Sequence, residues 1–211
     1  FAEGSTNTFK WTIATSENET VNLNHEIYTI TFIRTGVFVE PIVFFGFDES
    51  NLLPEIGEGN FNLLNINNEV EYFSGNNSNL GAQITGYAEQ STGSGTSGIS
   101  VEASTFGYND ITISFDQRAS ATGSRWAAIE YTTDGETWTL LENNQGSLAP
   151  HNNWVSYEFD LTAIEEVNNN PNFAVRVVSI FAPEAFGEFE ANTAYRPAST
   201  DETANYNPSG A

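Results

Sequence analysis

Period-two alternation of apolar and polar residues is the feature that most constrains how this chain can fold. In "DITISFD" (110–116) and in "WVSYEFDL" (154–161), every second residue is apolar. Successive side chains of a β-strand point to opposite faces, so each stretch predicts a strand with one buried and one solvated face. In the second stretch the residues expected to point inward are Val155, Tyr157, Phe159 and Leu161.

The remaining strand signals are short and separated by turn residues. Asp134-Gly135 predicts a tight hairpin, residues 74–98 are rich in Gly, Ser and Asn and predict a loop, and 161–167 could form at most one helical turn. This pattern predicts an all-β fold, an antiparallel β-sandwich of jelly-roll type spanning 41–211, after an N-terminal extension (1–40). Further strands are expected at 25–40, 42–48 (apolar on both faces), 60–66, 69–73, 99–104, 125–133, 137–142 and 172–181, the last as a central strand, and more weakly at 188–195.

Composition excludes several classes of partner. The chain has 28 acidic and six basic residues and a net charge of −22, so nucleic acid and anionic membrane surfaces would repel it. No stretch approaches the roughly 18 apolar residues of a membrane span, so we expect no membrane insertion. Cysteine and methionine are both absent, which rules out disulfides and is compatible with an extracellular or cell-surface location.

Three segments together resemble a widespread bacterial secreted β-sandwich module: 111–138, 154–181 and, more weakly, 42–61. They carry "SFDQR", "YTTDGETW" and "NPNFAVR". The resemblance implies a lectin-like jelly roll that is appended to extracellular and surface-anchored proteins, usually without catalysis of its own. Members of that family close with one more strand, patterned roughly Trp-Arg-Phe-Asp-Asn-Val. The present sequence stops at "YNPSGA" (206–211), where that strand would start, and carries some 40 extra residues in front.

The extra front segment contains a candidate for the missing strand. In "NTFKWTIA" (7–14), Phe9, Trp11 and Ile13 alternate with smaller or polar residues. We expect this strand to fill the vacancy, in its own subunit or in a neighbour. The sequence therefore predicts a non-enzymatic extracellular structural protein, a filament or surface-assembly subunit and hence a homo-oligomer or polymer of identical subunits.

The alternative function is a carbohydrate-binding or adhesion module that binds extracellular glycans. Trp126, Trp138 and Trp154 could stack on sugar rings, and Trp154 lies out of phase with the inward residues of its strand. Catalysis has little support, because His25 and His151 lie near no nucleophile motif.

Two further predictions concern charged residues. Calcium takes six to eight oxygen ligands, and Asp48, Glu49 and Asn51 could supply some of them, as could Asn168–Asn170. Three of the six basic residues fall in the predicted sandwich strands and are expected to pair with carboxylates across one sheet face. The cations are Arg118, Arg125 and Arg176, and the carboxylates are Asp116, Glu130 or Asp160.

Overall fold

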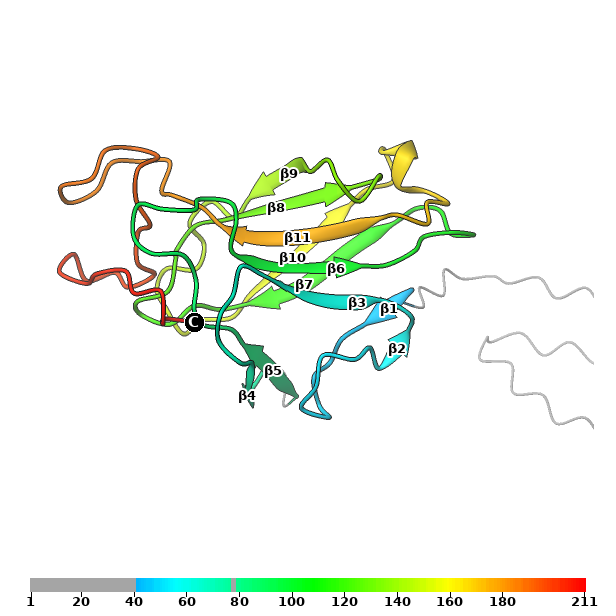
Figure 1. Cartoon of the computed structure of the whole chain (residues 1–211), viewed down its shortest axis with the longest axis horizontal. Helices are drawn as coiled ribbons and strands as arrows, with labels where there is room; N and C mark the ends of the chain where they lie inside the picture. The colour runs from blue at the N-terminus through cyan, green and yellow to red at the C-terminus, as the bar shows by residue number, and fades with distance from the viewer. Residues whose placement is uncertain (1–40, 77–78) are drawn as a thin grey trace, which may run out of the picture. The chain divides into compact units, whose positions relative to one another are not determined.

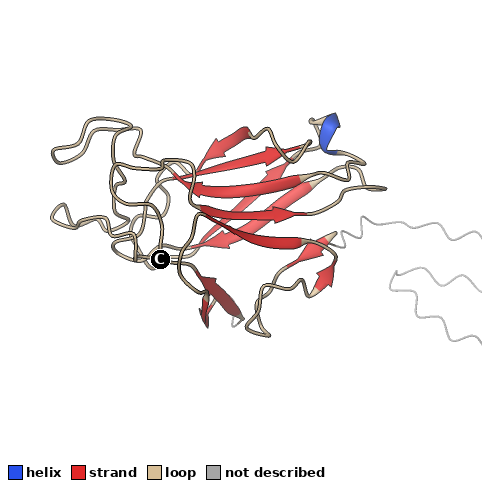
Figure 2. Cartoon of the chain, in the orientation of Figure 1, coloured by secondary structure: helices blue, strands red, loops and turns tan. Residues whose placement is uncertain are grey.

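The computed structural model describes residues 41–76 and 79–211. The chain divides into two units, 1–40 and 41–211, and the described part is built almost wholly of antiparallel strands (Figures 1 and 2). The predicted all-β sandwich is confirmed, while the jelly-roll topology stays a prediction. The strands expected at 7–14 and 25–40 lie outside the described residues. In the described part, no helix has the length and apolar character that a membrane span requires.

The main sheet has five strands in the order β3-β6-β11-β8-β9. The middle strand, β11, lies within the nearly continuous apolar run 172–181, as the sequence predicts. Residues Ala174, Val175, Val177 and Val178 of this strand are buried. The bounds are β3 Asn60–Leu64, β6 Gly98–Glu102, β8 Ala127–Thr132, β9 Thr139–Asn143 and β11 Ala174–Ser179.

The second sheet consists of β7 (Thr112–Gln117) and β10 (Val155–Asp160), paired over six positions. Their apolar faces pack on the main sheet, and β8 and β9 are joined by the predicted turn, in which Gly135 has φ 79°. The shared core consists of Ile111, Ala127, Ile129, Leu161, Val167, Phe173, Val175 and Val177.

The smaller elements depart from the prediction in three places. The strand expected at 42–48 is reduced to β1 (Val43–Phe44), paired with β2 (Ile56–Gly57), because the backbone turns at Phe47, where φ is 63°. Part of the expected loop forms β5 (Leu80–Gln83), which pairs with β4 (Glu71–Ser74). The segment 188–195 forms no strand and takes part only in an isolated bridge between Phe186 and Phe189. The single helical turn is η1 (Glu165–Val167).

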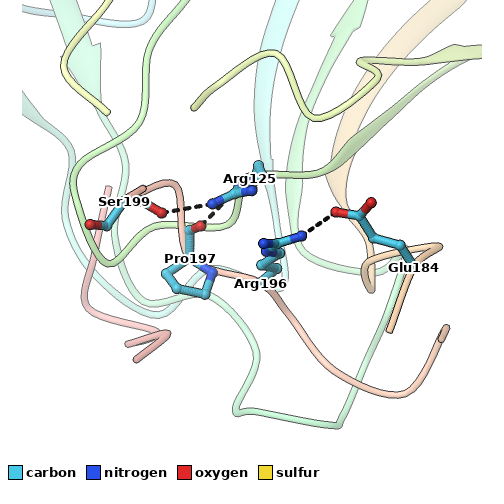
Figure 3. Close-up of polar contacts among 5 residues, drawn as sticks. All are labelled: Arg125, Glu184, Arg196, Pro197 and Ser199. Carbon is cyan, nitrogen blue, oxygen red and sulfur yellow. Dashed lines mark hydrogen bonds and ion pairs between the residues drawn. The ribbon is translucent and has the colours of Figure 1, made fainter. Parts of the chain in front are cut away.

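The C-terminal segment, orange to red in Figure 1, forms loops at the end of the sandwich away from η1. Arg125 fastens it by donating from Nε to the Pro197 carbonyl (3.1 Å) and from Nη2 to the Ser199 carbonyl (2.7 Å), as Figure 3 shows. Arg196 pairs with Glu184 beside it. The expected partner of Arg125 was a carboxylate, and that prediction is wrong: backbone carbonyls of a distant segment, which no local pattern reveals, take its donors.

Tyrosines complete this end of the molecule. Tyr195 is fully buried, its ring centre lies 4.7 Å from that of Tyr206 with the two rings tilted, and its hydroxyl donates to the Thr92 carbonyl. Burial disfavours the charged phenolate and raises the pKa of Tyr195 to about 12. The pKa of Tyr87 is raised to about 12 for the same reason.

We predict a loss of stability at alkaline pH caused by these tyrosines. An unfolded tyrosine ionises near pH ~10, so their contribution is fully present below that pH and is lost as the pH rises toward the folded-state value. Urea unfolding on either side of pH ~10 should show the loss, and Tyr195→Phe should reduce it. The ionisation of the tyrosines can be followed by the absorbance of tyrosinate in the folded protein. If all tyrosines ionise at the same pH, this prediction is contradicted.

Candidate functional site

The outer face of the main sheet carries a polar array. Residues of β8 and β11 such as Ile129, Val175 and Val177 face the core, so their neighbours in sequence face outward. Antiparallel pairing aligns these outward residues in rows across β3, β6, β11 and β8. In that strand order the rows are Asn62, Ser100, Arg176 and Glu130, and then Asn60, Glu102, Ala174 and Thr132.

Arg176 is the cation of this array. Its Nε donates to Glu130, confirming the predicted ion pair, and its guanidinium lies 4.5 Å from the centre of the Trp138 ring. Both partners of the pair are about four-fifths buried, with side-chain exposures of 22% and 18%. The charge of Arg176 is therefore compensated by Glu130, and its guanidinium is stacked on the Trp138 ring.

Glu102 lies at the β3 side of the array and has no cationic partner among the described residues. Asn60 and Asn62, two residues apart on β3, each donate from Nδ2 to one of its carboxylate oxygens, at 2.9 and 3.0 Å. A carboxylate offers about four acceptor positions. The two amides orient Glu102 and leave acceptor capacity facing outward.

The β8–β9 hairpin closes the array on the other side. Asp134 accepts hydrogen bonds from the Thr132 hydroxyl and from the backbone N–H groups of Glu136 and Thr137, all through Oδ1. These bonds, that from Thr137 first, lower the pKa of Asp134 well below its usual range. The turn therefore presents a firmly ionised carboxylate and holds Trp138 over the sheet.

A pocket of about 390 Å³ lies between β3, the hairpin and the segment that leads into β11. Such a volume is within the range of small-ligand sites. Its lining includes three carboxylates and, among the described residues, no Lys, Arg or His. The residues used below are Glu58, Ser100, Glu102, Asp134, Trp138 and Phe173.

Ser100 is the most unusual member of the lining. It is only 5% exposed, and its hydroxyl makes no hydrogen bond to any residue that the structure describes. Its oxygen is not one of the fully buried, unpaired side-chain atoms of the described residues, so it is open to the pocket, where it provides a donor and an acceptor.

A second candidate site is the β7–β10 sheet, which is incomplete compared with the sheet it covers. Over 41–76 and 79–211, these two strands pair only with each other, and no other backbone segment bonds to their outer edges. On the inner face Phe115 stacks on Tyr157 at 4.9 Å and on Phe159 at 6.4 Å. All three remain half-buried. Two strands thus face five, with aromatic surface uncovered.

The three tryptophans predicted to bind sugar do not share one surface. Trp138 lines the pocket, whereas Trp126 is buried at 8% exposure. Trp154 is half-buried and carries Arg118, whose guanidinium lies 4.9 Å from its ring centre. Arg118 takes part in no ion pair with a described residue, so the carboxylate partner expected for it is not observed.

Two of the predicted calcium ligands accept hydrogen bonds from backbone N–H groups. Asp48 accepts from the Leu80 N–H at 2.9 Å, and Asn51 accepts from the Leu53 N–H at 2.7 Å. Within the described residues no group of three or more His, Asp or Glu side chains is placed to hold a metal ion. Calcium binding at Asp48, Glu49 and Asn51 stays a prediction. The oxygens of Asn168 and Asn169 likewise accept from the backbone of 107–110.

Other predicted residues fall outside this region. His151 is half-buried, with its Nδ1 unpaired among the described residues. The donor-strand residues Phe9, Trp11 and Ile13, together with His25, lie outside the part that the structure describes.

Sequence reasoning missed most of the pocket. Asn60, Glu102 and Asp134 lie far apart in the chain, and only the register of the main sheet brings them together. The available signal was the alternation itself, which placed polar residues on one face of 60–66 and 99–104. Comparison of the chain with protein-family models, curated sequences and solved structures found no significant match. The likeness to a secreted sandwich module therefore stays a prediction.

We predict unequal costs for breaking the two ion pairs. Glu130→Gln leaves the guanidinium of Arg176 without its charge partner in a mostly buried place, which should lower the free energy of unfolding by about 1–3 kcal/mol. Glu184→Gln removes the pair with Arg196, where Glu184 is 51% exposed, and serves as the matched control. It should cost less than about 1 kcal/mol. Urea unfolding measures the free energy of unfolding of both variants. An equal loss in the two would contradict the prediction that the Arg176–Glu130 pair contributes more.

Proposed function

We propose that this protein is a non-enzymatic extracellular structural subunit that joins copies of itself by strand addition. Residues 7–14 of one copy pair with the free edge of the β7–β10 sheet of the next. The observation that carries the proposal is the inequality of the two sheets in the described part, two strands facing five. Repetition of such a head-to-tail contact generates a filament or a surface layer.

Energetics favour a preformed acceptor. Burying Phe9, Trp11 and Ile13 yields roughly 6–9 kcal/mol, and each ladder hydrogen bond adds about 1 kcal/mol. Ordering eight residues costs roughly 8–16 kcal/mol. The donor alone is therefore near balance, and the half-buried Phe115 and Phe159 of the acceptor supply the additional apolar burial.

The donor has two conceivable acceptors, its own sheet and that of a neighbour. If residues 15–41 let it reach its own sheet, tethering at roughly millimolar effective concentration favours that sheet. If their geometry prevents this, the donor pairs with a neighbour and subunits polymerise head to tail, which is the arrangement proposed here. The high negative charge suits such an assembly in a salty medium, where screening weakens repulsion between subunits.

Replacing the donor's apolar face tests the proposal. The combined variant Phe9→Ala, Trp11→Ala and Ile13→Ala should convert polymers into folded monomers, because the face that is buried in the neighbour is lost. Lys10→Ala with Thr12→Ala, on the opposite face of the same segment, is the control and should leave assembly intact. Light scattering and negative-stain microscopy measure the outcome. Full-length protein that stays monomeric at every concentration would exclude strand exchange between copies.

A second candidate function is glycan binding, favoured by the pocket with Trp138 at its wall and an unpaired Ser100 hydroxyl in its lining. An aromatic ring with a few placed polar groups is the usual form of a small-ligand site. The same protein could serve both in assembly and in adhesion, since the pocket lies on the outer face of the main sheet and the free edges belong to the other sheet.

Substitution of Trp138 and of Trp154, one at a time, distinguishes glycan binding at the pocket from a purely structural role of the β8–β9 hairpin. Trp138→Ala should abolish retention of the protein on immobilised oligosaccharides, because the ring forms part of the pocket wall. Trp154→Ala removes a half-buried tryptophan outside the pocket and should leave retention unchanged. Circular dichroism checks that both variants fold. Retention lost in Trp154→Ala alone would place the glycan site elsewhere.

A further inference from the structure

We propose that the pocket on the main sheet selects glycans that carry free, protonated amino groups. This inference rests on the glycan-binding candidate and deepens it by naming the ligand class. It is carried by the combination of three features in one cavity: carboxylates with no cationic partner among the described residues, an aromatic wall and the Ser100 hydroxyl, which is open to the pocket.

The charges of the pocket favour a cation. Glu58, Glu102 and Asp134 line it, and no cationic side chain of the described chain does. Arg176, close by in the array, is held by Glu130. The three carboxylates are exposed to solvent, and an ammonium group that reaches them can form charge-assisted hydrogen bonds, which are stronger than neutral ones. An anionic sugar would be repelled, both by the pocket and by the net charge of −22.

Glu102 is the best-placed partner for the ammonium. The two asparagine amides fix its carboxylate, so little side-chain entropy remains to be lost when a ligand binds. Asp134 stands on the opposite wall, held in its ionised form by the turn.

Trp138 and Ser100 account for the sugar ring. Trp138 is half-exposed, and Arg176 stacks on its ring system, so the ring supplies an apolar wall already fixed in position. The Ser100 hydroxyl can bond a ring hydroxyl. The volume of about 390 Å³ suits a single sugar unit more than a long segment of chain.

Titration calorimetry of the full chain with three oligosaccharides tests the inference. The probes are glucosamine oligomers, the same oligomers fully N-acetylated, and oligogalacturonate. We expect the amino form to bind about tenfold or more tightly than the N-acetylated form, because a hydrogen bond to a charged group is lost on acetylation. The galacturonate should not bind, and added salt should weaken binding of the amino form.

Two isosteric variants assign the effect to the pocket. Glu102→Gln should weaken binding of the amino form about tenfold and leave the N-acetylated form unchanged. Glu158→Gln is the matched control, because it removes the same charge from the exposed face of β10, outside the pocket. It should leave both affinities unchanged. An equal loss in the two variants would show diffuse attraction to a polyanion and would overturn the pocket assignment.

The outcomes distinguish the preference for amino groups from glycan binding itself. Equal binding of the amino and N-acetylated forms, both lost in Trp138→Ala, would overturn the charge preference and leave the glycan site standing. Binding of neither form would remove the glycan function together with the inference. Neither result bears on assembly by strand addition, which is measured separately.

Discussion

The antiparallel register around β11 is the constraint on which the rest of the structure depends. Pairing of β11 with β6 on one side and β8 on the other aligns Ser100, Arg176 and Glu130 in one outward row. The same register turns Val175 and Val177 into the core. A shift of one residue would exchange the two faces, burying the ion pair and exposing the valines. Core and pocket are thus two consequences of one set of hydrogen bonds.

The two sheets differ in completeness, and this difference organises the proposed functions. On the outer face of the main sheet, side chains are held in place by hydrogen bonds to one another, as in the contacts of Glu102 with Asn60 and Asn62. The β7–β10 sheet has free edges in the described part and a half-buried aromatic inner face. The first surface is suited to recognising a small ligand and the second to accepting a strand. The two can operate in one subunit without competing.

Stability without disulfides comes from aromatic packing and from long-range bonds to the backbone. Tyr195 is fully buried at the end of the sandwich, and Arg125 ties the C-terminal segment to the start of β8 through two carbonyls. The two bonds of Arg125 join residues 72 and 74 positions apart, and the bond from Tyr195 to Thr92 joins residues 103 positions apart. These contacts connect loops that have no regular secondary structure.

The sequence by itself determined the elements that depend on local periodicity and turn chemistry. It placed the strands of both sheets, the inward set of β10 and the Asp134-Gly135 hairpin, and it anticipated the Arg176–Glu130 pair. Only the tertiary structure decided that Trp126 is buried, that Arg125 binds carbonyls, that the backbone turns at Phe47 and that Glu102, Asp134 and Trp138 surround one pocket. The physical reason is that alternation reports which face of a strand is apolar, whereas neighbours across a sheet are fixed by the pairing of strands distant in the chain.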